Sequence, residues 1–211
     1  MIGRSEAGQD GWVLTKLGHK RGGFFVDAGA HDGVICSNTL ALERDYGWRG
    51  ICIEGGRPNY NVLVEKRECL CKLACLHSAN EPVRFFDLGL NSSLVTDGRQ
   101  IGTVMLGVTL ERVLDDLHAP RVIDYLSMDI EGHEFEVLRV FPFDRYKFLT
   151  MTVEHNSYSV GSAHRDRLRE LLTGHGYILD RADVLTPDGK PYEDWYVRPE
   201  CDSTAPISHG A

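Results

Sequence analysis

Short apolar runs alternate along the chain with segments whose apolar positions follow a helical period. Runs rich in β-branched and aromatic residues predict strands. The helical period is clearest at Leu110, Val113, Leu114 and Leu117, which follow the i, i+3, i+4, i+7 spacing of one buried helix face. Strands are expected at 24–27, 50–54, 69–74, 83–86, 104–108, 124–130, 148–154, 177–179 and 195–197, and helices at 37–44, 59–66, 110–117, 134–140 and 165–175. This alternation is typical of βαβ units and predicts an α/β fold with a mainly parallel sheet.

The pattern also predicts where the domain begins and ends. We expect one domain over residues 22–200, preceded by a helical cap segment at 1–21 and followed by a flexible tail at 201–211. Within it, residues 88–102 are rich in Gly, Asn and Ser and predict a loop. Strand 124–130 is apolar almost throughout, as expected for a central strand covered by helices on both faces.

Composition narrows the class of protein. The chain has 211 residues, of which 42% are hydrophobic and 26% charged, and this suits one domain with a sizeable core. The net charge of −8 and the lack of a basic stripe disfavour nucleic acid as a partner. No signal-peptide core is present, and no apolar run approaches the ~18 residues of a membrane span. A cytoplasmic protein without membrane association is the expectation.

A glycine-rich turn follows the first predicted strand, in the sequence Val-Asp-Ala-Gly-Ala-His-Asp-Gly at 26–33. Glycines let the backbone turn tightly beside a ligand, and the following helix offers free N–H groups. The turn lacks the Gly-x-Gly-x-x-Gly that binds a pyrophosphate, and Asp27 suits a cationic methionine moiety better than a diphosphate. It therefore predicts a nucleoside site, against the alternative of a purely structural turn.

Acidic residues end three of the predicted strands. Glu54 lies about twenty residues beyond the turn, the position from which a carboxylate accepts hydrogen bonds from ribose hydroxyls. Asp129 and Glu154 end two later strands, so both are expected in one crevice. There they could hold a divalent cation, orient a substrate hydroxyl or act as a base. His133 and His155 add groups that take a proton near neutral pH, unless they are only packing residues.

These motifs together resemble the FkbM-type methyltransferases. The resemblance runs from about Gln9 to Val197 and is carried, in order, by residues 22–33, 37–39, 47–54, 123–132 and 153–156. It implies a Rossmann-like class I methyltransferase fold, with a mainly parallel seven-stranded sheet, helices on both faces and an antiparallel strand near the C-terminus. It also implies S-adenosylmethionine as cofactor and a hydroxyl of a sugar or polyketide-type product as methyl acceptor.

The resemblance assigns roles to individual residues, with two departures. The residues that border the methionine and ribose would be Asp27, Gly29, Ala30 and Gly33. Asn38 would also bind the cofactor, Glu54 would bind the ribose, and Ala74 would lie by the adenine. Asp129 would lie beside the reacting methyl group. The first departure follows Glu54, where the family usually has Pro and this chain has Gly55-Gly56, so that its loop would be looser. The second is His133, at a position where family members commonly have a small residue. Fold-level analogy adds Mg²⁺ between Asp129 and Glu154.

The expected reaction is displacement of a methyl group by a hydroxyl, and the proton acceptor stays open. His133, His155 or a metal at Asp129 and Glu154 could assist the hydroxyl. The acceptor is expected to meet 88–102 and 157–164, whose Asn91, Ser92, Ser93 and Tyr158 favour a polar small molecule. A homodimer partner or a mobile loop would complete its pocket. The rival classes are a nicotinamide-dependent oxidoreductase, disfavoured by the missing dinucleotide turn, and a nucleoside-binding module without catalysis.

Overall fold

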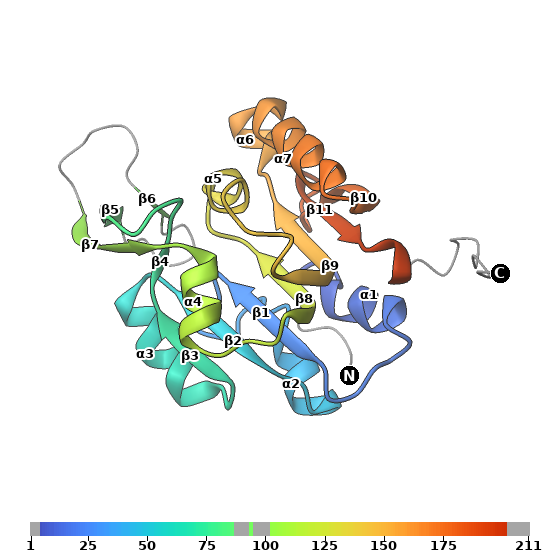
Figure 1. Ribbon diagram of the computed structural model, residues 1–211, viewed down its shortest axis with the longest axis horizontal. Coiled ribbons are helices and arrows are strands. Elements are labelled where there is room, and N and C mark those ends of the chain that lie inside the picture. Colours follow the sequence, from blue (N-terminus) through green and yellow to red (C-terminus); the bar gives the residue numbers. More distant parts are fainter. Residues whose placement is uncertain (1–4, 87–92, 95–101, 202–211) are drawn as a thin grey trace.

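The computed structural model describes residues 5–86, 93–94 and 102–201, with no account of the Ser93 side chain. A large twisted sheet runs through the centre and carries helices on both faces, while a smaller sheet lies at one side (Figure 1). Of the expected loop 88–102, only Ser93, Leu94 and Gly102 fall within the described residues, and the expected tail beyond Cys201 lies outside them.

The large sheet has seven strands in the order β10-β11-β9-β8-β1-β2-β3. Their bounds are Phe24–Ala28 (β1), Arg49–Glu54 (β2), Leu70–Leu73 (β3), Val122–Met128 (β8), Lys147–Glu154 (β9), Ile178–Leu185 (β10) and Pro191–Val197 (β11). β11 pairs antiparallel with both neighbours, whereas the remaining pairs are parallel. The predicted parallel sheet with an antiparallel strand near the C-terminus is confirmed.

Helices cover both faces because the central strands are apolar on both sides. The helices are Gln9–Lys16 (α1), Leu40–Tyr46 (α2), Arg57–Lys66 (α3), Leu110–Asp116 (α4), Glu134–Leu138 (α5), Ser157–Val160 (α6) and Ser162–Gly174 (α7), with a 3₁₀ turn at Pro199–Cys201. Val26 of β1 packs in one core cluster with α4, α5 and α7. The next residue toward the N-terminus, Phe25, packs in the other with α1, α2 and α3. This alternation is the period-2 geometry of a strand covered on both faces.

The N-terminal helix α1 is part of the core. Trp12 packs on Trp195 of β11 with ring centroids 4.9 Å apart. The amide of Gln9 donates to the hydroxyl of Tyr192 and to Glu193 Oε2, both at 2.8 Å and both buried. Among the described residues, none of the helices has the length and apolar character that crossing a membrane requires.

A second, four-stranded sheet of order β4-β7-β5-β6 was not predicted. Its strands are Cys75–Leu76 (β4), Pro82–Phe86 (β5), Ser93–Leu94 (β6) and Thr103–Val108 (β7). The sequence did predict the two longer strands, at 83–86 and 104–108, but not that they form a separate sheet. A two-residue strand carries too little pattern to be recognised, and β6 lies inside the expected loop.

Several boundaries also differ from those expected. α2 begins at Leu40, because the Ser37 hydroxyl accepts a hydrogen bond from the Leu40 N–H at 3.2 Å and ends the preceding turn. β8 ends at Met128, so Asp129 lies just beyond the strand. β10 continues to Leu185 although its second half alternates charged and apolar residues, because it is an edge strand with one partner.

Candidate active site

A cavity of about 330 Å³ lies at the carboxyl ends of β1, β2, β8 and β9. Its size falls within the range of small-molecule sites, and the edge is where open α/β sheets bind ligands. Of the residues predicted to bind the cofactor or take part in the reaction, the cavity is lined by Asp27, Gly29, Ala30, Asn38, Glu54, Ala74, Asp129, His133 and Glu154. Gly33 and His155 are not among the residues that line it.

Gly29 allows the turn after β1 to approach the loop after β8. Its φ is +86°, and a Cβ at this position would lie 1.6 Å from the carbonyl oxygen of Asp129. The N–H groups of Gly29 and Ala30 both donate to the Ile53 carbonyl, at 3.0 and 3.1 Å. A side chain would push these segments apart, so the glycine is required by close backbone approach as well as by conformation.

Glu54 is held in a fixed orientation at the cavity wall. Its Oε2 accepts from the N–H of His31 at 2.9 Å, and its Oε1 from that of Gly56 at 2.6 Å. Gly55, the first residue of the departure from the family pattern, packs against the ring of Phe85, since a Cβ there would lie 2.9 Å from it. Packing therefore explains Gly55, and the N–H that residue 56 donates to Glu54 excludes Pro at that position.

Asp27 lines the cavity but its carboxylate also belongs to a buried network. Its Oδ2 accepts from the Thr39 hydroxyl at 2.5 Å, and Arg67 donates to the same hydroxyl at 2.9 Å. Burial raises the pKa of Asp27, while Arg67 and Thr39 oppose that rise. Arg67 and Thr39 escaped sequence reasoning because neither lies in a motif.

Gly33 and Asn38 have different surroundings. A Cβ on Gly33 would meet Leu63 of α3 at 2.5 Å, so this glycine serves helix packing. Asn38 lines the cavity and donates to the Ser127 hydroxyl at 3.0 Å. Its Oδ1 is buried with no hydrogen-bond partner, and a buried polar atom of this kind indicates a missing ligand or water.

Three carboxylates meet at one end of the cavity, and we call Asp129, Glu131 and Glu154 the carboxylate cluster. Each contributes an oxygen, and these oxygens all lie within 4.8 Å of one another. Burial, and then the charge of its neighbours, raises the pKa of Asp129 and of Glu154 well above the ordinary range. Burial and the nearby Glu134 raise the pKa of Glu131 to about 7. The sequence analysis did not propose a role for Glu131, although the residue lies within 123–132, one of the segments that carry the family resemblance.

The loop that carries Asp129 and Glu131 is fixed from α5. Glu134 Oε1 accepts from the N–H groups of Ile130 and Gly132, at 2.9 and 3.1 Å. Its other oxygen lies 3.0 Å from His164 Nε2. Glu134 is fully buried, so it serves the loop and not the cavity.

His133 lines the cavity at the N-terminus of α5. Its ring stacks on that of His77, with centroids 5.3 Å apart. Burial and the neighbouring His77 lower the pKa of His133. A lowered pKa keeps the imidazole neutral near pH 7, which is the form that accepts a proton.

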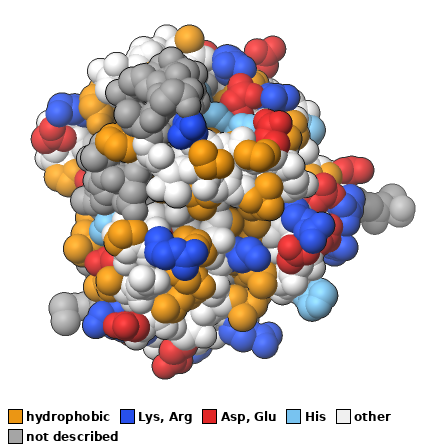
Figure 2. Space-filling model, turned by 90° about the vertical axis from the view of Figure 1, so that its left-hand side faces the viewer, with side chains coloured by type: hydrophobic (Ala, Val, Ile, Leu, Met, Phe, Trp, Pro, Cys, Tyr) orange, Lys and Arg blue, Asp and Glu red, His pale blue; other side chains and the backbone are white. Residues whose placement is uncertain are grey.

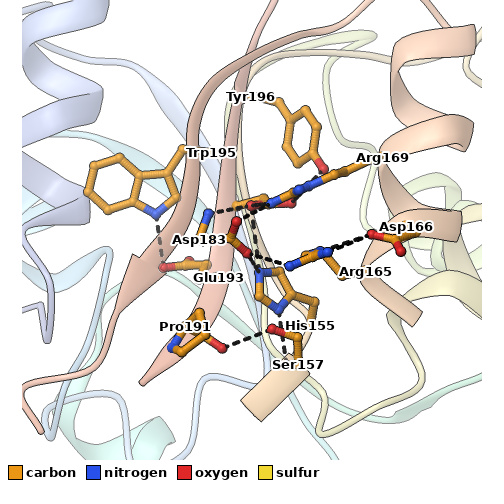
Figure 3. A network of polar contacts seen from close by, with 11 residues as sticks. His155, Ser157, Arg165, Asp166, Arg169, Asp183, Pro191, Glu193, Trp195 and Tyr196 are labelled. Carbon is orange, nitrogen blue, oxygen red and sulfur yellow. Dashed lines mark hydrogen bonds and ion pairs between the residues drawn. The ribbon is translucent and has the colours of Figure 1, made fainter. Parts of the chain in front are cut away.

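His155 lies in a different environment from the one expected. It is buried, its Nδ1 accepts from the Ser157 N–H at 3.1 Å, and its Nε2 lies 3.6 Å from Asp194 Oδ1 (Figure 3). Both ring nitrogens are thus directed at groups of β11 and of its own loop. With the ring outside the cavity lining, we do not carry His155 forward as a base.

The lining of the cavity is polar and contains many acidic side chains. From the segment after β9 and from the β10–β11 hairpin the cavity is lined by Asn156, Tyr158, Thr186 and Tyr192. Tyr158 was expected here, whereas Thr186 and Tyr192 were not; Asn91 and Ser92 lie outside the described residues. Six carboxylates are among the lining residues: Glu6, Asp27, Glu54, Asp129, Glu131 and Glu154. On the face seen in Figure 2, basic side chains are scattered among acidic ones.

The described residues fit an adenosyl cofactor. Glu54 presents an oriented carboxylate, Asn38 an unsatisfied buried oxygen, and Gly29 a turn without side chain, all in one cavity. The sheet order with its single antiparallel strand, together with this cavity, defines a class I S-adenosylmethionine-dependent methyltransferase. The sequence model of the Methyltransferase FkbM domain matches residues 27–179, so the chain belongs to the FkbM methyltransferase family.

Solved structures show the same fold. The FkbM methyltransferase of Methylobacillus flagellatus KT gives a TM-score of 0.55 at 18% identity, over 82% of this chain and 43% of its own. The METTL16 methyltransferase domain gives 0.55 at 13% identity, over 89% and 65%. A Clostridium thermocellum protein assigned as an rRNA methylase gives 0.52 at 13%, over 93% and 97%. These identities support the fold alone. Comparison with functionally curated proteins finds no match.

Proposed function

We propose that this methyltransferase acts on a hydroxyl group of a small polar molecule such as a sugar or another natural product. One observation carries the proposal. The cavity that contains the Gly29 turn and Glu54 also contains the carboxylate cluster and His133. A cofactor held at the first pair would present its methyl group toward the second, where an acceptor could be oriented and deprotonated.

Three residues would bind and orient the cofactor. Glu54 has both oxygens directed by backbone N–H groups and can accept further hydrogen bonds from ribose hydroxyls. Asn38 Oδ1 can accept one from a cofactor N–H or O–H, which would satisfy a buried atom. Asp129 would lie near the positive charge. The cofactor, when bound, supplies a methyl group on a sulfonium, a good leaving group.

The remaining task is to align a hydroxyl and remove its proton. The hydroxyl oxygen forms the new bond to the methyl carbon as the carbon–sulfur bond breaks, and the sulfur keeps that electron pair. His133, which lines the cavity as a neutral imidazole, would take the hydroxyl proton. Asn156, Tyr158 and Tyr192 would position the acceptor and displace water from it.

The acidity of the cavity favours a neutral or cationic acceptor. Phosphate groups would find no Lys or Arg among the described lining residues to pair with, and they would lie beside acidic side chains. Nucleic-acid binding draws on clustered Lys and Arg, and the chain carries a net charge of −8. Both observations disfavour RNA as the methyl acceptor, and RNA is the alternative acceptor that the experiment below includes.

Calorimetry followed by a transfer assay tests the proposal. We expect S-adenosylmethionine and S-adenosylhomocysteine to bind with one-site stoichiometry, and NAD not to bind. We then expect isotope-labelled methyl to be transferred to hydroxyls of a panel of neutral sugars and phenols, and not to an RNA oligonucleotide. NAD binding alone would indicate an oxidoreductase. Cofactor binding without transfer to any acceptor would indicate a binding module, and transfer to RNA alone would overturn the acceptor class.

A further inference from the structure

The carboxylate cluster brings together side chains from two separate segments. Asp129 and Glu131 belong to the loop after β8, and Glu154 ends β9. Their nearest oxygens lie within 4.8 Å of one another, and all three residues line the cavity. Side chains from two strand ends thus converge on one point that is open to a ligand.

One oxygen in this cluster has no partner in the protein. Glu154 is 6% exposed, and its Oε2 is buried without a hydrogen bond. A buried carboxylate oxygen without a donor is costly, because nothing replaces the water it has lost. The atom is therefore best explained by a group that binds in the cavity.

The charges around the cluster are negative. The carboxyl groups of Glu131, Glu134 and Glu193 disfavour a charge on Asp129, and Glu154 is hydrogen-bonded to it, so none of these neighbours is a cation. Like charges this close cannot all remain ionised without compensation. Among the described residues the compensation has to come from a proton or from a ligand.

Glu131 is held in place by a strained loop. Its φ is +58°, in the left-handed region that non-glycine residues rarely adopt. Glu134 binds the N–H groups on either side of it, those of Ile130 and Gly132. Strain maintained by neighbouring contacts is typical of functional sites. Here the strained conformation brings the third carboxylate to Asp129 and Glu154.

We propose that Asp129, Glu131 and Glu154 form a binding site for a divalent cation of the Mg²⁺ or Mn²⁺ type, with Glu131 as the ligand that completes the pair predicted from sequence. The donor set consists of oxygens only, which hard divalent cations prefer. Such ions keep several waters and need an open side, which the cavity provides. When bound, the ion would lower the pKa of a hydroxyl that coordinates it.

Titration of the full chain with MnCl₂ tests this site without cofactor or acceptor. We expect saturable one-site binding by calorimetry and by loss of the free-Mn²⁺ electron paramagnetic resonance signal, with competition by MgCl₂. Glu131→Gln should weaken Mn²⁺ binding at least about tenfold. Even the loss of a residue that only hydrogen-bonds to a metal ligand typically lowers metal affinity by about that factor. Glu136→Gln is the matched control, since Glu136 pairs with Arg139 at 2.5 Å outside the cavity and should leave binding unchanged.

The cation site lies in the cavity proposed for methyl transfer and so rests on the proposed function, but the outcomes of this experiment distinguish the two proposals. Absence of one-site Mn²⁺ binding to the wild type, or equal binding by Glu131→Gln, would falsify the proposal whatever the activity. Thermal unfolding gives a second readout, because MnCl₂ should raise the midpoint of the wild type and of Glu136→Gln more than that of folded Glu131→Gln at the same concentration. Mn²⁺ binding without methyl transfer to any acceptor would support the site while the proposed function failed.

Discussion

Arg169 and Asp194 form a two-pronged ion pair next to the segment that follows β9. Arg169 Nε and Nη2 donate to the two carboxylate oxygens of Asp194, at 2.7 and 2.8 Å. Asp194 also accepts from the Asp183 N–H at 2.8 Å and faces His155 (Figure 3). The pair thus joins α7, both strands of the C-terminal hairpin and the segment after β9. That segment continues directly to Asn156 and Tyr158, which line the cavity.

Breaking this pair is expected to cost substantial stability. The Asp194 side chain is 2% exposed, so Arg169→Met leaves a buried carboxylate without the cation that pairs with both of its oxygens and should lower the free energy of unfolding by about 3 kcal/mol. Arg112→Met is the matched control, because its pair with Asp116 is equally short at 2.8 Å but 63% and 39% exposed. Because solvent screens this exposed pair, the loss should be much smaller than for Arg169→Met. Urea unfolding measures both, and equal losses would contradict the role given to Arg169.

The neighbouring Glu193 is expected to make the protein less stable as pH rises. Burial raises the pKa of Glu193 to about 7 from 4.5, despite hydrogen bonds from Trp195 and Gln9. Folding therefore favours the protonated form, whose stabilisation is complete below pH 4.5 and is lost as pH rises to about 7.

Glu193→Gln should remove this dependence while keeping the neutral hydrogen bonds. Relative to the variant, the wild type should lose up to about 3 kcal/mol of unfolding free energy between pH 4.5 and pH 7.5. Urea unfolding of both proteins at the two pH values measures the difference. Parallel pH profiles would show that Glu193 does not titrate in this range. Asp194 should show the opposite pH dependence of stability. Arg169 holds the pKa of Asp194 low, so the stability that the Asp194 carboxylate contributes is lost as pH falls, and Asp194→Asn should remove this dependence.

Gly29→Ala tests the close approach of two loops at the cavity. The new Cβ would lie 1.6 Å from the Asp129 carbonyl oxygen, so the turn must move and cofactor affinity should fall at least about tenfold. Gly189→Ala has the same φ of +86° but no atom within 4 Å of its Cβ. It controls for backbone strain alone, which costs about 1–2 kcal/mol. S-adenosylhomocysteine calorimetry should show loss only for Gly29→Ala, and equal affinities would remove the steric argument.

Much of the fold and of the cofactor side could be predicted because their signals are local. Apolar runs flanked by turns identified the main strands, and acids at their ends had to share one edge because parallel strands end together. Glu54, Asp129 and Glu154 were found in this way, and all three line the cavity. Their ligands and catalytic roles remain predictions.

The remainder depended on contacts that the sequence does not encode locally. Glu131 joins the cluster from a left-handed backbone conformation, which non-glycine residues rarely adopt and which the sequence does not announce. His155 follows Glu154 directly, yet successive side chains leave a strand end in opposite directions, and this one meets Asp194 instead of the cavity. Thr186 and Tyr192 reach the cavity through hairpin pairing across the sheet, at a sequence distance that no motif spans.

His133→Ala tests the residue proposed to take the acceptor proton. Because His133 is proposed to take the acceptor proton and not to bind the cofactor, cofactor affinity should persist while turnover falls by at least about 10², the usual scale for a lost general base. Calorimetry with S-adenosylhomocysteine and single-turnover methyl transfer measure the two effects separately.

The substitution also removes the ring stacked on His77, so its effect needs a control for packing. His77→Ala abolishes the same stack, with its 5.3 Å centroid separation, but leaves His133 in the cavity wall. It should keep turnover within a few-fold of wild type. Comparable losses in the two variants would mean that the stack shapes the loop and that His133 takes no proton. Unchanged turnover in His133→Ala would mean that another group takes the acceptor proton, and His31 and the carboxylates that line the cavity would be the next residues to test.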